Sequence, residues 1–311
     1  MSRRRLRFGV LGAAWVANRA LLPAMNAARN AEAHAIASRD VERARSMAAA
    51  NGVAVVHRSY EEVIADPDVD AVYIPLVNSL HLPWTMRALR AGKHVLCEKP
   101  LGCSAAEART MAGAARESGL LVMEALMYRF HPRMVDLRAR TTTVVRLLHA
   151  AFSFTVNDEA NYRLSAELGG GALLDVGCYT LDVARWFCGT PRRVTSIIRG
   201  SPVDMSVAAL IEFGGGALAA VTSSLEAAEQ QELTIVTDMG AERIDEPFTA
   251  WHDPHDPYQL MVEAFADSAL EGAPSPLPLE ESIATAELTD RVRGAAAGPH
   301  ELSEGAVPSA R

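Results

Sequence analysis

The first 126 residues alternate two patterns of hydrophobic and polar positions. Short apolar runs indicate buried strands, and segments with apolar residues three and four apart indicate helices. The expected strands are 6–12, 31–39, 71–76, 94–100 and 120–126. The expected helices are 13–28 with a kink or break at Pro23, 40–52 with Asp40 as its cap, 60–70 with a terminal turn, 81–92 and 104–119. This alternation predicts a doubly wound parallel α/β sheet of five or six strands.

After about residue 126 the apolar runs are separated by Gly, Pro and charged turns, mostly without a helix between them. The expected strands are 143–156, 194–200, 206–213, 217–226 and 232–238. They predict an antiparallel or mixed open sheet. A helix is expected within 168–189 and another at 257–272, and the segment 280–298 closes the ordered chain. The sequence thus predicts two domains, 1–124 and an α+β domain over 125–300, followed by a disordered tail at 301–311.

Composition and charge narrow the class of protein. The chain has 311 residues, of which 49% are hydrophobic, and a net charge of −8. The negative charge argues against a nucleic-acid partner, whose binding surface would be basic. No apolar stretch approaches the ~20 residues of a membrane span. The four cysteines show no metal-binding spacing, so we expect free thiols in the cytoplasm, without a disulfide or a metal site.

A glycine turn joins the first expected strand to the first helix. A dinucleotide-binding fingerprint reads G-x-G-x-x-G, and Gly12, Ala14 and Ala17 hold its three positions. Small residues let backbone N–H groups approach a pyrophosphate, whose charge the helix N-terminus favours. This turn predicts a dinucleotide site that also includes Trp15 and Val16, although two alanines weaken the motif and a plain strand–helix turn is the alternative.

The end of the second strand bears on the choice of cofactor. A carboxylate at this place binds the ribose 2′-hydroxyl of NAD, whereas here the strand ends in Ser38 and Arg39. A hydroxyl and a guanidinium suit a 2′-phosphate, so NADP(H) is the predicted cofactor. NAD(H) stays possible, with Asp40 as the ribose ligand and Arg39 in a surface ion pair.

The loops after the expected strands 71–76 and 94–100 lie where open α/β sheets bind ligands. Leu76 and Asn78 are predicted to contact the cofactor, with a helix cap as the alternative for Asn78. His81 completes this cofactor set, although a first-turn histidine is commonly structural. The next strand ends in Glu98 and Lys99, both assigned to the cofactor site. Lys99 is predicted to point into the crevice, and the alternative is a salt bridge between these two residues.

Two further segments carry unusual polar residues. Just past the expected strand 120–126, Tyr128 and Arg129 suit a polyhydroxylated substrate, although each alone is more often structural. On the helix within 168–189, Asp175, Tyr179 and Asp182 are spaced i, i+4 and i+7, which places them on one face. Burying such groups without partners costs ~1–3 kcal/mol each. We therefore interpret Asp175 and Tyr179 as site residues, and leave Asp182 open between a site role and an ion pair.

These segments together resemble the glucose–fructose oxidoreductase / inositol dehydrogenase (Gfo/Idh/MocA) family. The resemblance rests on "GVLGAAWVA", "EKPL", "EALMYRFHP" and "GGGALLDVGCYTLD" in this order, and it runs over nearly the whole chain. It implies a Rossmann domain that binds NAD(P) and an open-sheet domain that holds the substrate and often the oligomer contact. In having a tyrosine at position 179, the chain is similar to the subgroup of dihydrodiol dehydrogenases and sugar ketoreductases.

The resemblance also implies residue roles. The family's lysine falls on Lys99, its helix aspartate on Asp175 and its acid/base residue on Tyr179, while "NYRLSAELGGG" implies that Tyr162 and Arg163 lie near the substrate. The expected activity is hydride transfer between nicotinamide and a ring hydroxyl or ketone of a sugar, cyclitol or related polyol. Lys99 is expected to lower the pKa of the Tyr179 phenol, while burial and the nicotinamide charge lower that of Lys99 itself.

Two other functions and an oligomeric state are open at this point. One alternative is redox-assisted cleavage of a glycosidic or other C–O bond, and the other is a non-catalytic NADP-binding regulator. By analogy with the family, we expect a homodimer or homotetramer.

Overall fold

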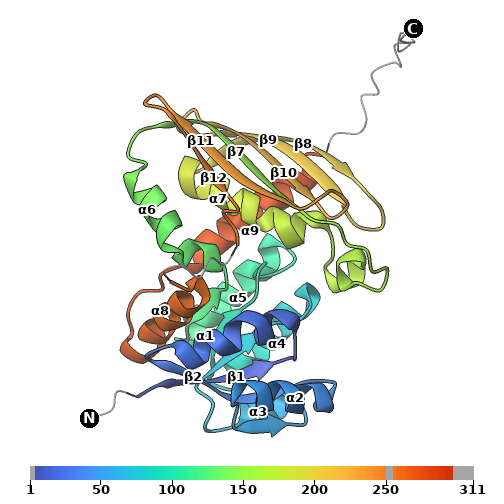
Figure 1. Cartoon of the computed structure of the whole chain (residues 1–311), viewed down its shortest axis with the longest axis vertical. Helices are drawn as coiled ribbons and strands as arrows, with labels where there is room; N and C mark the ends of the chain where they lie inside the picture. The colour runs from blue at the N-terminus through green and yellow to red at the C-terminus, as the bar shows by residue number, and fades with distance from the viewer. Residues whose placement is uncertain (1–3, 250–254, 297–311) are drawn as a thin grey trace.

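The structure is a computed structural model that describes residues 4–249 and 255–296; the predicted tail at 301–311 lies outside them. Two six-stranded sheets dominate it, one near each end of the long axis in Figure 1. The predicted α/β class is confirmed.

The first sheet is fully parallel, with strand order β3-β2-β1-β4-β5-β6. Its strands are β1 (Leu6–Leu11), β2 (Ala31–Ala37), β3 (Val55–His57), β4 (Ala71–Ile74), β5 (His94–Cys97) and β6 (Val122–Glu124). The helices of this half are α1 (Leu22–Ala27), α2 (Val41–Asn51), α3 (Tyr60–Ala65), α4 (His81–Arg90) and α5 (Ala105–Ser118). β4, β5 and β6 are buried almost throughout because helices cover both faces of the sheet.

Local sequence signals set several of these helix ends. Asp40 caps α2, and its carboxylate accepts a hydrogen bond from the Arg43 N–H at 3.0 Å. The helix expected at 13–28 differs from its prediction, because the π-helical turn η1 (Ala17–Leu21) precedes α1 and Pro23 lies in the first turn of α1. Pro23 follows closely on η1, where hydrogen bonds such as that from the Leu22 N–H to the Ala17 carbonyl already depart from the regular α pattern. β3 was not predicted, since its three half-buried residues carry little pattern.

The second sheet is mixed, with strand order β12-β11-β7-β10-β9-β8. Its strands are β7 (Val145–Ser153), β8 (Pro191–Arg199), β9 (Ser206–Phe213), β10 (Leu218–Ser224), β11 (Gln230–Thr237) and β12 (Ala241–Asp245). β7 and β10 pair in parallel, and the other neighbours pair antiparallel. β12 was not predicted, because its "AERID" is a short, polar edge strand.

The helices of the second half are α6 (Pro132–Arg140), α7 (Cys178–Cys188), α8 (Pro257–Glu271) and α9 (Leu279–Gly294). α7 and α9 pack on one face of the second sheet. α7 and α9 lie beneath the sheet in Figure 1, and α9 also packs on α5. α8 packs on the first sheet, where the rings of Phe265 and Phe8 are 5.5 Å apart. The C-terminal helices therefore return to the N-terminal half and fix the two sheets around a shared junction.

None of the helices over 4–249 and 255–296 is both long and apolar enough to cross a bilayer.

Candidate active site

A cavity of about 660 Å³ opens between the two halves. Its wall on the first half follows the carboxyl ends of β2, β1, β4 and β5, and contains Gly12, Ala14, Trp15, Val16, Ser38, Arg39, Leu76, Asn78, Glu98 and Lys99. The second half contributes Tyr162, Arg163, Asp175 and Tyr179. Fourteen of the seventeen residues that the sequence suggested therefore share one cavity.

The glycine turn fits close approach by a ligand. Gly12 has a φ of +121°, which disfavours residues with a side chain, and its N–H donates to the Ala37 carbonyl at 2.8 Å. Trp15 is 73% exposed at this turn although it is a large apolar residue. An exposed aromatic ring beside an open backbone turn is suited to covering a bound cofactor.

Lys99 is held by Asp175 from the other half of the molecule. Its Nζ donates to the Asp175 backbone carbonyl at 2.9 Å and to Oδ1 at 3.1 Å. Arg163 Nε donates to the other carboxylate oxygen at 2.6 Å. One buried carboxylate thus pairs with two cations, and the group of three side chains keeps a net charge of +1.

The charges of this group follow from that arrangement. Burial by itself raises the pKa of Asp175, but Lys99 and Arg163 outweigh it and hold that pKa below its ordinary value. Burial lowers the pKa of Lys99, but Asp175 outweighs it and the pKa stands well above its ordinary value. The expectation of a lowered lysine pKa is therefore wrong for the protein alone, because it did not include the buried countercharge.

Tyr179 lies next to the lysine. The Lys99 Nζ is 5.2 Å from the centroid of the Tyr179 ring, which also packs on Phe152 and Phe248. Burial raises the pKa of the Tyr179 phenol well above its ordinary value, and the Lys99 charge opposes this only in part. Lys99 thus lowers the Tyr179 pKa as expected, but burial outweighs it, so the phenol is protonated at neutral pH.

A π-helical turn, η6 (Leu173–Gly177), carries Asp175 into α7. π-helical turns interrupt the regular pattern of helix hydrogen bonds and often occur at functional sites. The backbone carbonyl of Asp175 accepts from Lys99 in this turn. The glycine run before it is needed for close packing: a Cβ at Gly169 would lie 2.7 Å from the Cys103 Sγ and 2.8 Å from the Asn78 Cβ.

Three predicted site residues lie behind the cavity instead of in its wall. Tyr128 is fully buried and its hydroxyl donates to Asp182, while Arg129 Nε lies 3.7 Å from the same carboxylate. His81 is also fully buried, with its ring nitrogens 2.8 Å from the Pro100 carbonyl oxygen and 3.0 Å from the Leu76 carbonyl oxygen. The sequence located these side chains near the crevice but gave no sign of which way they point.

Other residues of the cavity wall were not predicted. Arg43, Tyr60, Phe152, Phe154 and Tyr258 all line it. Arg43 had a signal, because it follows Arg39 by four residues at the start of a helix. Tyr258 had none, since it reaches the cavity only through the packing of α8 on the first sheet.

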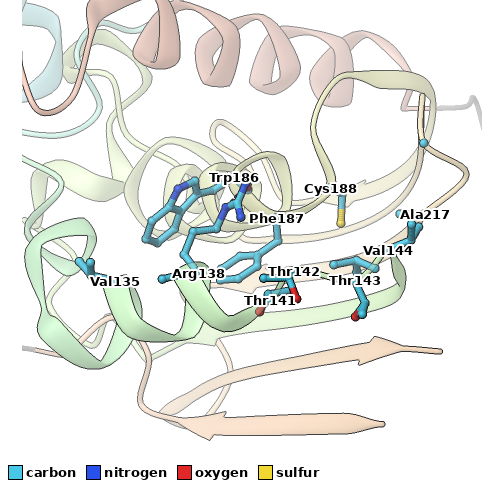
Figure 2. Close-up of a pocket in the computed structure, with 13 residues that line it drawn as sticks. Val135, Arg138, Thr141, Thr142, Thr143, Val144, Trp186, Phe187, Cys188 and Ala217 are labelled. Carbon is cyan, nitrogen blue, oxygen red and sulfur yellow. Dashed lines mark hydrogen bonds between the residues drawn. The ribbon is translucent and has the colours of Figure 1, made fainter. Parts of the chain in front are cut away.

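A second cavity, of about 720 Å³, lies between α6, the end of α7 and the loop that leads into β7 (Figure 2). Its wall is apolar and threonine-rich, and Arg138 is the single charged side chain among its described lining residues. It has no acid–base pair and no predicted site residue, so it is not the candidate site.

The comparisons with known proteins agree with the fold. An oxidoreductase family model described as an NAD-binding Rossmann fold matches residues 6–126, and a GFO/IDH/MocA C-terminal domain model matches residues 139–241. The chain belongs to the GFO/IDH/MocA family of oxidoreductases, as the sequence motifs predicted.

Three relatives show which members it is similar to. A D-xylose 1-dehydrogenase (NADP(+)) from Haloferax volcanii is 37% identical, over 92% of this chain and 96% of that protein. A trans-1,2-dihydrobenzene-1,2-diol dehydrogenase from Xenopus laevis is 33% identical over 66% of this chain and 64% of that protein. The crystal structure of a 3-ketoreductase from Actinomadura kijaniata, in complex with NADP and TDP-benzene, is 32% identical with a TM-score of 0.83, covering 94% and 98% of the two chains.

Proposed function

We propose that the protein is an NADP(H)-dependent dehydrogenase or ketoreductase that acts on a ring hydroxyl or ketone of a sugar, cyclitol or related polyol. The observation that carries the proposal is the convergence of Lys99, Asp175 and Tyr179, from both halves, in the cavity that also contains the glycine turn. The relatives support it, since their names include an NADP-dependent xylose dehydrogenase and a ketoreductase crystallised with NADP.

The donor set at the end of β2 supports NADP(H) over NAD(H). Ser38, Arg39 and Arg43 line the cavity, and two guanidinium groups with a hydroxyl suit a phosphate. Asp40, the alternative ribose ligand, caps α2 and is exposed outside the cavity wall. We expect Arg39→Ala and Arg43→Ala each to raise the KM for NADP(H) about tenfold, with little effect on NAD(H). A wild-type preference for NAD(H) would reject this part of the proposal.

Each catalytic residue has a role that follows from its charge. The cofactor, when bound, supplies or accepts the hydride. Tyr179, protonated at neutral pH, gives its proton to the oxygen of a ketone that is being reduced, and takes one from the alcohol in the reverse direction. Lys99, held cationic by Asp175, orients that oxygen and stabilises the tyrosinate formed by proton transfer. Arg163 and Asp175 fix the position of the ammonium group, and Tyr162 lies in the same wall for substrate contact.

Turnover assays with a substrate panel test the activity. NADP⁺ is offered with D-xylose, other aldoses, inositols and dihydrobenzenediol, and NADPH with dTDP-linked keto sugars, while NADPH absorbance is followed. Lys99→Ala and Tyr179→Phe are expected to bind NADPH as the wild type does and to lose ~10²–10⁴-fold in kcat. Near-normal turnover by both variants would contradict the assignment, and cofactor binding without turnover on the whole panel would contradict the activity.

The exposed face of the second sheet supports the expected homo-oligomer. Leu147, Ile197, Leu210 and Leu218, on four strands of this sheet, are each more than half exposed. An apolar cluster of this kind on a sheet face is typical of a protein interface. We expect sedimentation to show a dimer or tetramer, and Leu210→Lys to weaken it. A monomeric wild type would contradict this expectation.

A further inference from the structure

The turn that carries Lys99 is anchored on the side away from the cavity. The backbone N–H of Leu101 donates to Oε1 of Glu124 at 2.8 Å. Glu124 ends β6, where the parallel register places it beside Cys97, the last residue of β5. The carbonyl of Pro100 is held by His81. The backbone next to the catalytic lysine is therefore held, on the side away from the cavity, by hydrogen bonds to buried side chains.

Glu124 has neither a countercharge nor a complete set of hydrogen bonds. It is 3% exposed, and no ion pair links it to a cation among the described residues. Its Oε2 has no hydrogen-bond partner over the same residues, and neither does the buried hydroxyl of Ser282 on α9. An unpaired carboxylate is costly to bury, whereas a protonated acid is neutral and gains an O–H donor.

A small cavity behind the turn connects these two groups. It measures about 10 Å³ and is lined by Leu101, Glu124, Cys178, Ser282 and Thr289, among others. This is about the space that one buried water needs, and such a water requires two or more polar partners. Glu124 Oε2 and Ser282 Oγ supply two.

The surroundings favour the neutral acid. Burial raises the pKa of Glu124 to about 7, and Asp182 and Glu98 act in the same direction. The Ser282 hydroxyl lies near enough to oppose this shift without the geometry of a direct hydrogen bond, and the Leu101 N–H opposes it as well. The titratable groups that face Glu124 are Cys97 and Glu98 at the end of β5 and Cys178 and Asp182 on α7, and Cys103 lines the same small cavity. α9 presents to the small cavity Ala286 and the hydroxyls of Ser282, Thr285 and Thr289. The nearby cations are engaged elsewhere, Lys99 with Asp175 and Arg129 with Asp182.

We propose that Glu124 is a positioning residue for Lys99 that acts in its protonated form. Its Oε1 accepts from Leu101, and its O–H donates to one buried water shared with Ser282. Loss of this proton places a negative charge beside Glu98 and Asp182 without a countercharge, which disturbs the turn and slows turnover. The proposal rests on the proposed function, because the consequence for catalysis depends on the role of Lys99.

The pH dependence of turnover tests the consequence. Glu124→Gln keeps the acceptor for Leu101, offers an N–H donor in place of the O–H, and cannot ionise. The wild-type kcat is expected to fall about threefold or more between about pH 6 and pH 8, while Glu124→Gln keeps most of the pH 6 rate and lacks this fall. Glu124→Asp, which is one methylene shorter, should lose kcat with little change in the KM for NADPH. Parallel pH profiles for wild type and Glu124→Gln would overturn the proposal.

An infrared titration tests the proton itself without any substrate. The wild-type protein with NADPH should show a protonated-carboxyl band near pH 6 that is lost as the pH rises to about 9. Glu124→Gln should lack that band, and Glu117→Gln, which changes an exposed acid on α5, should keep it. Identical spectra for wild type and Glu124→Gln would refute the protonated state. The band without turnover on any substrate of the panel would refute the proposed function alone.

Discussion

Two buried acids lie on opposite sides of the turn that carries Lys99, and their surroundings shift their pKa values in opposite directions. Asp175 contacts two cations on the cavity side, which hold its pKa below its ordinary value. Glu124, behind the turn, contacts a backbone N–H and no cation among the described residues, and burial raises its pKa to about 7. The two side chains are almost equally buried, at 2% and 3% exposed. Burial therefore does not decide the charge of either acid; the neighbouring cations do.

This difference has a functional meaning at neutral pH. On the cavity side, Asp175 has a lowered pKa and holds the Lys99 ammonium group through its backbone carbonyl and its carboxylate. Behind the turn, the pKa of Glu124 is raised to about 7. The charge on the cavity side is therefore expected to be insensitive to pH near neutrality, whereas the charge behind the turn is expected to change with it.

The largest effect is expected from the cavity side. Asp175→Asn leaves Lys99 and Arg163 partly buried without their countercharge. We expect a ~10²–10⁴-fold loss of kcat and a loss of about 3 kcal/mol in unfolding free energy. Turnover and urea unfolding of this variant measure both. A variant with wild-type rate and stability would remove the distinction between the two acids.

The next effect concerns stability against pH at Glu124. Since its pKa is raised in the folded state, its contribution is fully present below the unfolded pKa and is lost as the pH rises to about 7. A shift of this size corresponds to roughly 3 kcal/mol. Urea unfolding at about pH 5 and pH 8 should therefore show this loss in the wild type and not in Glu124→Gln. Asp175 behaves with the opposite sign, because its lowered pKa makes its contribution disappear only as the pH falls through the acid range. Equal pH slopes for wild type and Glu124→Gln would show that Glu124 is ionised in the folded protein.

A third prediction tests whether Tyr128 stabilises the junction between the two halves or contacts the substrate. Tyr128 was expected to contact substrate, but its hydroxyl donates to Asp182 deep in the junction. Tyr128→Phe should cost about 1–3 kcal/mol in unfolding free energy, because Asp182 loses a partner, and should leave the substrate KM unchanged. A raised KM with unchanged stability would return Tyr128 to the substrate site.

The smallest effect is expected at Ser282. Ser282→Ala removes one partner of the proposed buried water and should lower unfolding free energy by about 1 kcal/mol, with kcat within about twofold of wild type. The infrared band of the Glu124 acid should shift, because the hydrogen bonding of its O–H changes. An unchanged band would place the Glu124 O–H away from Ser282.

The sequence alone predicted most strands of both sheets, and it singled out Lys99, Asp175 and Tyr179, which the structure brings together. The spacing of apolar residues, together with the Gly and Pro residues between segments, located ten of the twelve strands of the described residues. The two that were missed, β3 and β12, are short edge strands. The "EKP" and helix motifs identified Lys99, Asp175 and Tyr179 because each is polar where its neighbours are apolar. A local pattern of this kind can be recognised without knowing how distant segments pack.

The features that could not be predicted from the sequence depend on packing between distant segments. The Lys99–Asp175 contact joins residues 76 positions apart, so its effect on the lysine pKa was not visible from either segment. Tyr128 and Arg129 follow a strand end, but whether they face the cavity or the junction depends on how α7 and α9 pack against them. The anchoring role of Glu124 likewise required the register of β5 and β6 and the position of α9.

The central claim is that Lys99 and Tyr179 act on the same ligand oxygen. It is tested most directly by a double-mutant cycle on single-turnover hydride transfer, using Lys99→Ala, Tyr179→Phe and the combined variant with NADPH or NADP⁺ and the best substrate of the panel. Residues that act as one unit have strongly non-additive effects. We therefore predict that the double variant reacts within about tenfold of the slower single variant. Losses that multiply in full would show that the two side chains act independently and would contradict the account.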